Sequence, residues 1–251
     1  MIRTPVPSAY CTACTHRGTV RSRNEDSVLA RPRLGLWAVA DGAGGHGGGE
    51  VASAAVTEAL ESIPAGLSAA EILAQLRLRL SSVHASLQAR SAAERRPRPM
   101  ATTVVMMIMR GGHFAALWAG DSRAYLLRHG EMVRITRDHS LVQELVESGA
   151  LTEEEAERHP QANVITRAIG AEGELELDKV TGRYADGDTF LLCSDGLFKA
   201  IEEPGIAARL RAGATAESLI ADAVSHGARD NVTAVVIRIG DSTNASDDTL
   251  S

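Results

Sequence analysis

One stretch of the chain combines a buried strand, a glycine-rich turn and the start of a helix. It reads Leu34-Gly35-Leu36-Trp37-Ala38-Val39-Ala40-Asp41-Gly42-Ala43-Gly44-Gly45-His46-Gly47. The apolar run stops abruptly at Asp41, which is typical of a buried strand. Beyond the glycines, apolar residues recur from Val51 to Ile63 with a period of 3.6, which predicts an amphipathic helix.

The glycine cluster formally satisfies G-x-G-x-x-G, so a dinucleotide-binding turn has to be weighed. The acidic residue at a suitable distance, Glu61, lies within the helical pattern, whereas that motif places its acid at the end of the next strand. Asp41, directly before the first glycine, would also repel a pyrophosphate. The sequence has no Gly-Lys-Ser/Thr, which excludes a P-loop. We interpret the glycines as freeing the turn and letting a backbone carbonyl approach a metal ion.

The rest of the chain alternates irregularly between strand-like and helical patterns. Strands are predicted at 9–19, 27–31, 101–109, 113–119, 123–128, 132–135, 174–182, 189–193 and 232–239. Ser68 with Glu71, and Thr152 with Glu155, have the spacing of capping boxes, and each predicts the start of a helix. Further helices are predicted at about 141–146, 205–211 and 216–226. Because the helices are clustered, the pattern favours an α+β fold with layered antiparallel sheets over a doubly wound parallel sheet.

Composition excludes several classes of protein. The chain has 251 residues, 26 basic and 32 acidic, and its net charge of −6 argues against a nucleic-acid binder. No apolar run approaches the roughly 18–20 residues of a membrane span. The first seven residues do not resemble a secretory signal, and three cysteines are too few for a disulfide scaffold, so we expect a cytoplasmic protein. Cys11 and Cys14 would face opposite sides of a strand, so they are not expected to form a paired site.

Carboxylates stand where the predicted strands begin or end. These residues are Glu25, Asp26, Asp41, Asp121, Asp195 and Asp230. One Asp-Gly alone is most simply a turn. Several carboxylates that converge on one point repel one another unless cations lie between them. Oxygen ligands with little His or Cys favour Mg²⁺ or Mn²⁺ over Zn²⁺, and two such ions can activate water for phosphoryl transfer.

Taken in order, these segments resemble the metal-dependent protein phosphatases of type 2C, in particular the compact bacterial serine/threonine phosphatases. The matching pieces are 18–26 (GTVRSRNED), 41–46 (DGAGGH), 120–123 (GDSR), 194–196 (SDG) and 230–231 (DN). Two more, 136–140 (TRDHS) and 163–170 (NVITRAIG), are similar to the borders of that family's flap. The resemblance spans about residues 9–239.

The resemblance implies a four-layer α/β/β/α sandwich of two mostly antiparallel sheets with helices outside. It implies a lead at 1–8, one catalytic domain at 9–239 with a small flap subdomain at about 138–170, and a disordered tail at 240–251.

The resemblance also implies roles for the acidic residues. Asp41 would bridge two Mg²⁺ or Mn²⁺ ions, and the Gly42 carbonyl would bind one of them. Asp195 and Asp230 would hold the other ion, and Glu25 would act through bound water.

Other residues would assist. Arg21 would bind the substrate phosphate with its bidentate donors, and Asp121, with Asp195, would form a weaker third metal site. Asp26 and Asn231 would support the metal ligands. Relatives from eukaryotes carry a proposed general acid directly after Asp-Gly, where this chain has Ala43, and His46 is a weak candidate for that role or for support.

The implied activity is hydrolysis of phosphoserine and phosphothreonine on proteins by direct attack of a metal-activated water. The expected partners are phosphorylated proteins, such as a Hanks-type kinase or its targets, with no nucleic acid and no membrane span, and the chain is expected to be a monomer. Two alternatives stay open: a catalytically silent module that binds phosphoproteins, and a small-molecule phosphohydrolase.

Overall fold

The strand, turn and helix around Asp41 are present in the computed structural model, which describes residues 8–43 and 47–240. Strand β3 (Leu36–Ala43) is fully buried as far as Ala40, and helix α1 (Gly48–Glu61) follows it. The two faces of β3 are both covered, which explains why its sequence is continuously apolar. Leu36, Ala38 and Ala40 pack toward helices, while Trp37 and Val39 pack toward the opposite sheet.

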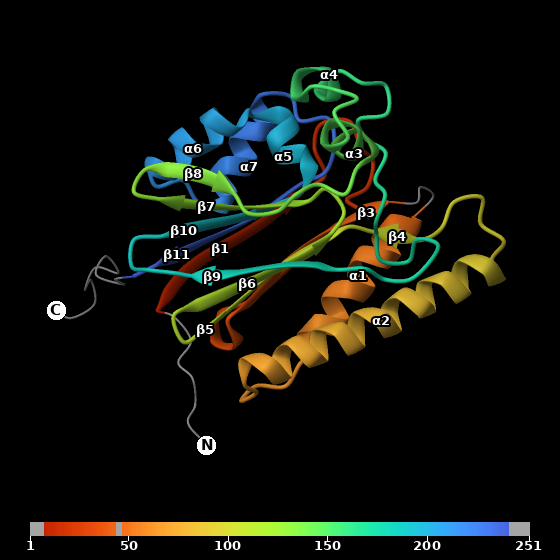
Figure 1. The fold of residues 1–251 in the computed structure, drawn as a ribbon, viewed down its shortest axis with the longest axis horizontal. Coiled ribbons are helices and arrows are strands. Elements are labelled where there is room, and N and C mark those ends of the chain that lie inside the picture. Colours follow the sequence, from red (N-terminus) through yellow and green to blue (C-terminus); the bar gives the residue numbers. More distant parts are fainter. Residues whose placement is uncertain (1–7, 44–46, 241–251) are drawn as a thin grey trace.

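The strands form two sheets in which every pairing is antiparallel, seen edge-on in Figure 1. The first sheet has the order β1-β11-β10-β7-β8 and consists of β1 (Ala9–His16), β7 (Arg123–Arg128), β8 (Glu131–Arg134), β10 (Thr189–Cys193) and β11 (Val232–Ile239). The second has the order β2-β3-β5-β6-β9 and adds β2 (Asp26–Arg31), β5 (Val104–Arg110), β6 (His113–Ala119) and β9 (Asp178–Arg183) to β3. The short strand β4 (Ala101–Thr102) pairs with the end of β3.

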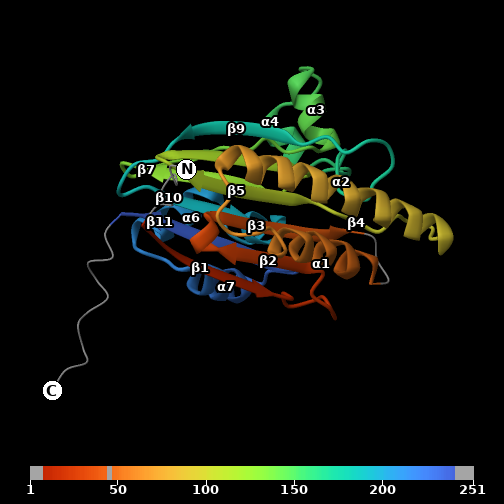
Figure 2. The ribbon, with the colours of Figure 1, turned by 90° about the horizontal axis from the view of Figure 1, so that it is seen from below.

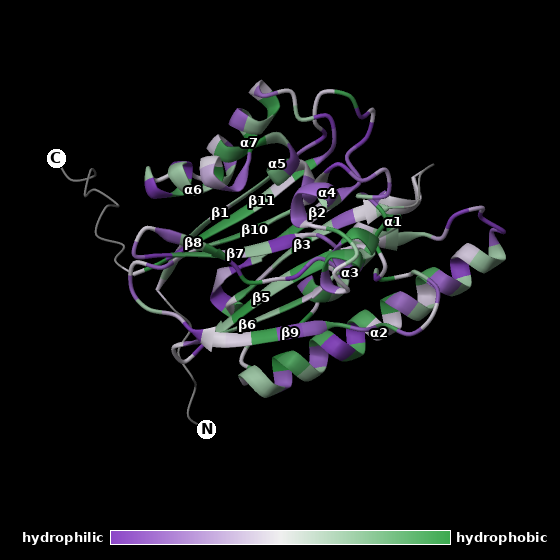
Figure 3. Cartoon of the chain, turned by 45° about the horizontal axis from the view of Figure 1, so that its top comes forward, coloured by the Kyte–Doolittle hydropathy of each residue, from purple (hydrophilic) through white to green (hydrophobic). Residues whose placement is uncertain are grey.

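Helices cover the outer face of each sheet. The second sheet packs against α1 and α2 (Ala69–Ala93), while α5 (Asp195–Ala200), α6 (Glu203–Arg211) and α7 (Ala216–Ser225) cover the first. Hydrophobic colouring runs along the central strands in Figure 3, whereas α2 shows alternating bands because one of its faces is exposed. This arrangement confirms the predicted four-layer α+β sandwich. No helix in the described part of the chain is long and apolar enough to cross a membrane.

The layer between the sheets contains several of the few aromatic residues of the chain. Phe114 and Phe190 meet edge to face across it, with ring centroids 5.1 Å apart, and Trp37 is fully buried beside them. Cys11 packs into this layer, whereas Cys14 packs on the other side of β1 against the helices. The two thiols are free and face apart, as the strand spacing predicts.

Several elements differ from the sequence predictions. Strand β1, predicted at 9–19, ends at His16, and β9, predicted at 174–182, begins at Asp178. Helix α5, which begins at Asp195 itself, was not predicted. The apolar run at 101–109 is interrupted at Thr103, whose N–H donates to the Asp41 carbonyl and so separates β4 from β5. Helix α2, whose start Ser68 and Glu71 predict, continues through Ala93. Both predicted capping boxes, at Ser68 and Thr152, are confirmed.

The segment 138–170 projects beside the sandwich and contains α3 (Leu141–Glu147) and α4 (Glu153–Glu157), as Figure 2 shows. Its first residue, Asp138, receives a bidentate ion pair from Arg123. At the same corner the Trp118 indole donates to the Arg137 carbonyl and stacks on His139, with ring centroids 5.9 Å apart. That this segment is a flap remains a prediction. The predicted lead and tail lie almost entirely outside the described residues.

Candidate metal centre

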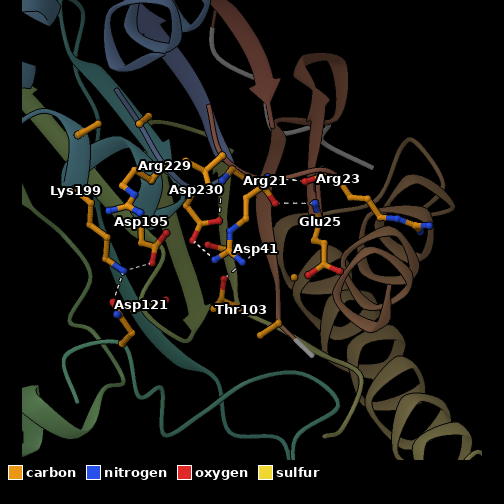
Figure 4. A pocket seen from close by; sticks show the side chains of 18 of the residues that line it. Arg21, Arg23, Glu25, Asp41, Thr103, Asp121, Asp195, Lys199, Arg229 and Asp230 are labelled. Atoms are coloured by element: carbon orange, nitrogen blue, oxygen red, sulfur yellow. Dashed lines mark hydrogen bonds and ion pairs between the residues drawn. The ribbon is translucent and has the colours of Figure 1, made fainter. Parts of the chain in front are cut away.

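One pocket of about 1240 Å³ opens where β2, β3, α5 and β11 meet. Its lining includes eight of the ten residues that the sequence singled out: Arg21, Glu25, Asp41, Gly42, Asp121, Asp195, Asp230 and Asn231. Asp26 lies behind this lining, and His46 lies outside the described residues. Figure 4 shows the carboxylates of both sheets directed toward the same space. The antiparallel topology explains this convergence, because strand ends that are distant in sequence share one edge of the sandwich.

Asp41 is the carboxylate at the end of β3. Its backbone is fixed by Thr103, whose side-chain oxygen accepts from the Asp41 N–H at 3.3 Å and whose N–H donates to the Asp41 carbonyl at 2.8 Å. Burial raises the pKa of Asp41 well above its ordinary value, and the charges of Asp26, Asp195 and Asp121 raise it further. A cation bound beside Asp41 would therefore favour its charged form.

Gly42 and Gly49 bring two backbones unusually close together beside Asp41. A methyl group on Gly42 would lie 2.4 Å from the carbonyl oxygens of both Glu25 and Gly49. A methyl group on Gly49 would in turn approach a carboxylate oxygen of Glu25 to 2.8 Å. No side chain therefore fits at either position without a backbone shift, so packing requires glycine at 42 and at 49.

Asp26 joins the two sheets beneath the pocket. Its Oδ2 accepts from the hydroxyls of Ser194, at 2.8 Å, and Thr233, at 2.7 Å, both on the opposite sheet. Its Oδ1 is buried and, among the described residues, has no hydrogen-bond partner. Burial raises the pKa of Asp26 to about 7, although the two hydroxyl hydrogen bonds act in the opposite direction. Asp26 thus sets the position of its neighbour Glu25 relative to the first sheet.

Asn231 fixes the loop that carries Arg21 and Glu25. Its amide nitrogen donates to the carbonyls of Arg17 and Arg23, and its amide oxygen accepts from the Glu25 N–H at 2.8 Å. The Asn231 N–H donates to Asp230 Oδ1 at 2.8 Å. One side chain therefore holds two of the candidate site segments in register.

Two cationic side chains touch the acidic floor. Arg21 donates to Asp230 Oδ2 at 2.7 Å from a largely exposed position at the pocket mouth. Lys199 donates to Asp195 Oδ2 at 2.5 Å. Sequence reasoning missed Lys199, because its relation to Asp195 is the i,i+4 spacing of a helix that was not predicted.

Asp121 comes from the turn between β6 and β7 and is almost fully buried. Burial raises its pKa to about 7, with a further contribution from Asp195. Within 8–43 and 47–240, no three His, Cys, Asp or Glu side chains already form a closed set of metal ligands.

Comparison with known proteins agrees with this architecture. A family model described as "Protein phosphatase 2C" matches residues 14–236. The chain belongs to the protein phosphatase 2C family. The resemblance inferred from the sequence motifs is therefore confirmed.

Individual relatives and solved structures match most of the length of this chain. The serine/threonine protein phosphatase PstP of Mycobacterium tuberculosis is 41% identical over 233 residues, which cover 91% of this chain but 45% of PstP. The structure of PppA, described as a key regulatory component of T6SS in Pseudomonas aeruginosa, matches with a TM-score of 0.87 and 38% identity, covering 94% of this chain and 99% of PppA. The catalytic domain of PstP in complex with two manganese ions matches with a TM-score of 0.77 and 38% identity, covering 93% and 99% of the two chains. The chain thus spans less than half the length of full PstP.

Proposed function

We propose that this chain is a protein serine/threonine phosphatase that hydrolyses phosphoserine and phosphothreonine on proteins. The observation that carries the proposal is that Asp41, Asp195 and Asp230 line one pocket whose mouth holds Arg21. Membership of the protein phosphatase 2C family supports it. The pairing of carboxylates from two sheets with an arginine matches the needs of phosphoryl transfer, which depends on positioning and on neutralising charge.

The residues present fit two Mg²⁺ or Mn²⁺ ions. The donors are all oxygens, which is the ligand set that these ions prefer. Asp41 is the centre of an acidic group, since burial raises its pKa and the charges of Asp26 and Asp195 raise it further. Asp41 and the Gly42 carbonyl would hold one ion, Asp195 and Asp230 the other, and Glu25 would act through water. Bound there, the two ions supply Lewis-acid stabilisation of the phosphoryl group and lower the pKa of an attacking water. The two manganese ions of the PstP catalytic domain support this assignment.

The chain's own groups bind and position the substrate. Arg21 reaches the phosphate through its guanidinium, which is 59% exposed and free to turn away from Asp230. Asn231 keeps Arg21 and Glu25 at fixed separation by holding their shared loop. Water attacks phosphorus directly in this proposal, and no phosphoenzyme forms.

The substrates proposed are phosphorylated proteins in the cytoplasm, including a Hanks-type kinase or its targets, and the phosphatase acts as a monomer. Asp121 and Asp195 are assigned to a weaker third ion. His46, which lies outside the described residues, is assigned a supporting role beside the metal ligands.

The test is hydrolysis of a phosphothreonine peptide with Mn²⁺, with and without a chelator. Asp41→Asn and Asp195→Asn should each lower kcat/KM by at least about 100-fold, which corresponds to roughly 2.7 kcal/mol. Lys179→Gln, a change at an exposed position on β9, is the control and should keep the wild-type rate. Activity that survives the chelator would refute the proposal.

The other two functions predict different outcomes of the same assays. Manganese binding without turnover of any phosphopeptide would indicate a phosphoprotein-binding module. Faster hydrolysis of free phosphoamino acids or nucleotides than of phosphopeptides would indicate a small-molecule phosphohydrolase.

A further inference from the structure

Lys199 connects the acidic floor of the pocket to the projecting segment 138–170. Its ammonium donates to Asp195 Oδ2 at 2.5 Å and to the Asn163 side-chain oxygen at 2.6 Å. Asn163 lies in that segment, and Asp195 begins α5, one turn before Lys199. Figure 4 shows the ammonium between Asp195 and Asp121.

The surroundings of this ammonium are strongly negative. Burial lowers the pKa of Lys199, but the attraction of Asp195 and the hydrogen bond to it outweigh burial, and Asp121 and Asp41 add to the net rise. Among the described residues, no side chain donates a hydrogen bond to the Asp121 carboxylate, so the nearby ammonium supplies its neutralising charge. Lys199 therefore stands where a cation is most strongly attracted.

The residue type at this position is unusual for this chain. Of its 26 cationic residues only two are lysines, Lys179 and Lys199. An ammonium is a compact point charge with three donors, whereas a guanidinium is a wide planar fork. The Lys199 ammonium is a compact cation with two oxygen partners in an acidic pocket, so it occupies the kind of position that a small metal ion would take.

We propose that Lys199 is a resident cation that competes with a third divalent ion for Asp195 and Asp121, and that it couples this competition to segment 138–170 through Asn163. The inference rests on the two-ion site of the proposed function. A third ion near Asp195 and Asp121 would stand beside a like charge and would have to displace Lys199. Displacing Lys199 would also break its hydrogen bond to Asn163.

The experiment measures ion stoichiometry and segment mobility, and neither readout requires turnover. Mn²⁺ is titrated calorimetrically, with free Mn²⁺ followed by electron paramagnetic resonance, into the wild type, Lys199→Gln and the matched control Lys179→Gln. We expect two tightly bound ions and a third that binds only weakly in the wild type and the control, and a third ion that binds at least tenfold more tightly in Lys199→Gln. Adding Asp121→Asn to Lys199→Gln should remove the third ion.

Hydrogen exchange of residues 138–170 tests the connection to Asn163. Exchange should accelerate in Lys199→Gln and in Asn163→Ala but not in Lys179→Gln. Asn163→Ala should bind Mn²⁺ as the wild type does, with only two tightly bound ions, because the ion pair between Lys199 and Asp195 is intact in this variant. Equal exchange in Asn163→Ala and the wild type would overturn the coupling.

The outcomes separate this inference from the proposed function. Two ions with unchanged affinities in both the wild type and Lys199→Gln would overturn the inference alone. No Mn²⁺ binding by the wild type would refute the proposed function, and the inference with it. If Lys199→Gln does not fold, Lys199→Met serves instead: it removes the positive charge, so the third ion should bind more tightly, and unchanged ion affinities in Lys199→Met would overturn the proposal.

Discussion

Replacing Gly42 by alanine tests whether the closeness of two backbones shapes the pocket. The added methyl group would lie 2.4 Å from the carbonyl oxygens of Glu25 and Gly49 and 2.5 Å from the Gly49 carbonyl carbon. Each carbon–oxygen distance would have to grow by roughly 1 Å to reach ordinary contact. Because all three obstacles are backbone atoms, no side-chain rotation relieves the overlap.

Overpacking in a well-packed region costs about 1–3 kcal/mol and occasionally more. We expect Gly42→Ala to lie at or above the upper end, about 3 kcal/mol, because α1 and the loop before β2 must both shift. For a chain of this size that corresponds to a fall in Tm of roughly 6–12 °C.

The assay is thermal unfolding followed by circular dichroism, together with urea denaturation at 25 °C. Gly48→Ala is the control in the same turn, because the nearest neighbours of its methyl group would be side-chain atoms: the end of the Arg96 side chain, at 3.0 Å, and Met100 Cγ, at an ordinary contact distance of 3.5 Å. Alanine is also favoured in a helix, so this variant should match or slightly exceed wild-type stability. A Gly42→Ala protein within about 1 kcal/mol of wild type, or an equal loss in Gly48→Ala, would refute the reasoning.

Three further predictions concern charged groups. Arg21→Ala should lower kcat/KM for a phosphopeptide by about 10- to 100-fold, because a charge-assisted contact to phosphate contributes roughly 1.5–3 kcal/mol. Calorimetry should show that this variant still binds Mn²⁺. Loss of both the activity and the Mn²⁺ binding would mean that Arg21 has a structural role. Asp188 is buried, and although burial raises its pKa, the Arg128 guanidinium and the Ala185 N–H lower it below its ordinary value. The stabilisation that ionised Asp188 contributes is therefore present above the unfolded pKa of about 4 and is lost as pH falls through the folded pKa. Urea denaturation should show Asp188→Asn less stable than the wild type by roughly 1.5–3 kcal/mol at pH 7, and this difference should narrow in acid. A difference in stability that does not depend on pH would contradict the prediction. Arg123→Met should cost roughly 3 kcal/mol in the same assay, because it leaves the buried Asp138 carboxylate without its bidentate partner; a loss below about 1 kcal/mol would mean that Arg134, 3.8 Å from Asp138, takes over the pairing.

Much of the fold could be predicted from the sequence, because local chemistry specifies it. The capping boxes at Ser68 and Thr152 fix helix starts through short-range hydrogen bonds, and the apolar run before Asp41 reflects burial on both faces of β3. Helix α5 could not be found in the same way. It has six residues, of which only Gly196 and Leu197 are fully buried, too few for a helical period.

The site shows the same division. The carboxylates could be selected because each stands at a strand boundary, and the pocket does bring them together. Their separate roles toward metal ions remain predictions. The hydroxyl contacts of Ser194 and Thr233 to Asp26, and the contact of Lys199 to Asn163, join residues far apart in the chain, and no local pattern in one sequence reports such pairs.

The two tryptophans give the molecule two independent optical probes. Trp37 is enclosed between the sheets, so its emission reports on the integrity of the sandwich. Trp118 stacks on His139 and donates to Arg137 at the base of segment 138–170, so its emission reports on that corner. With Trp37→Phe, Trp118 is the single tryptophan, and its emission, excited selectively over that of the tyrosines, follows loosening of the corner in real time.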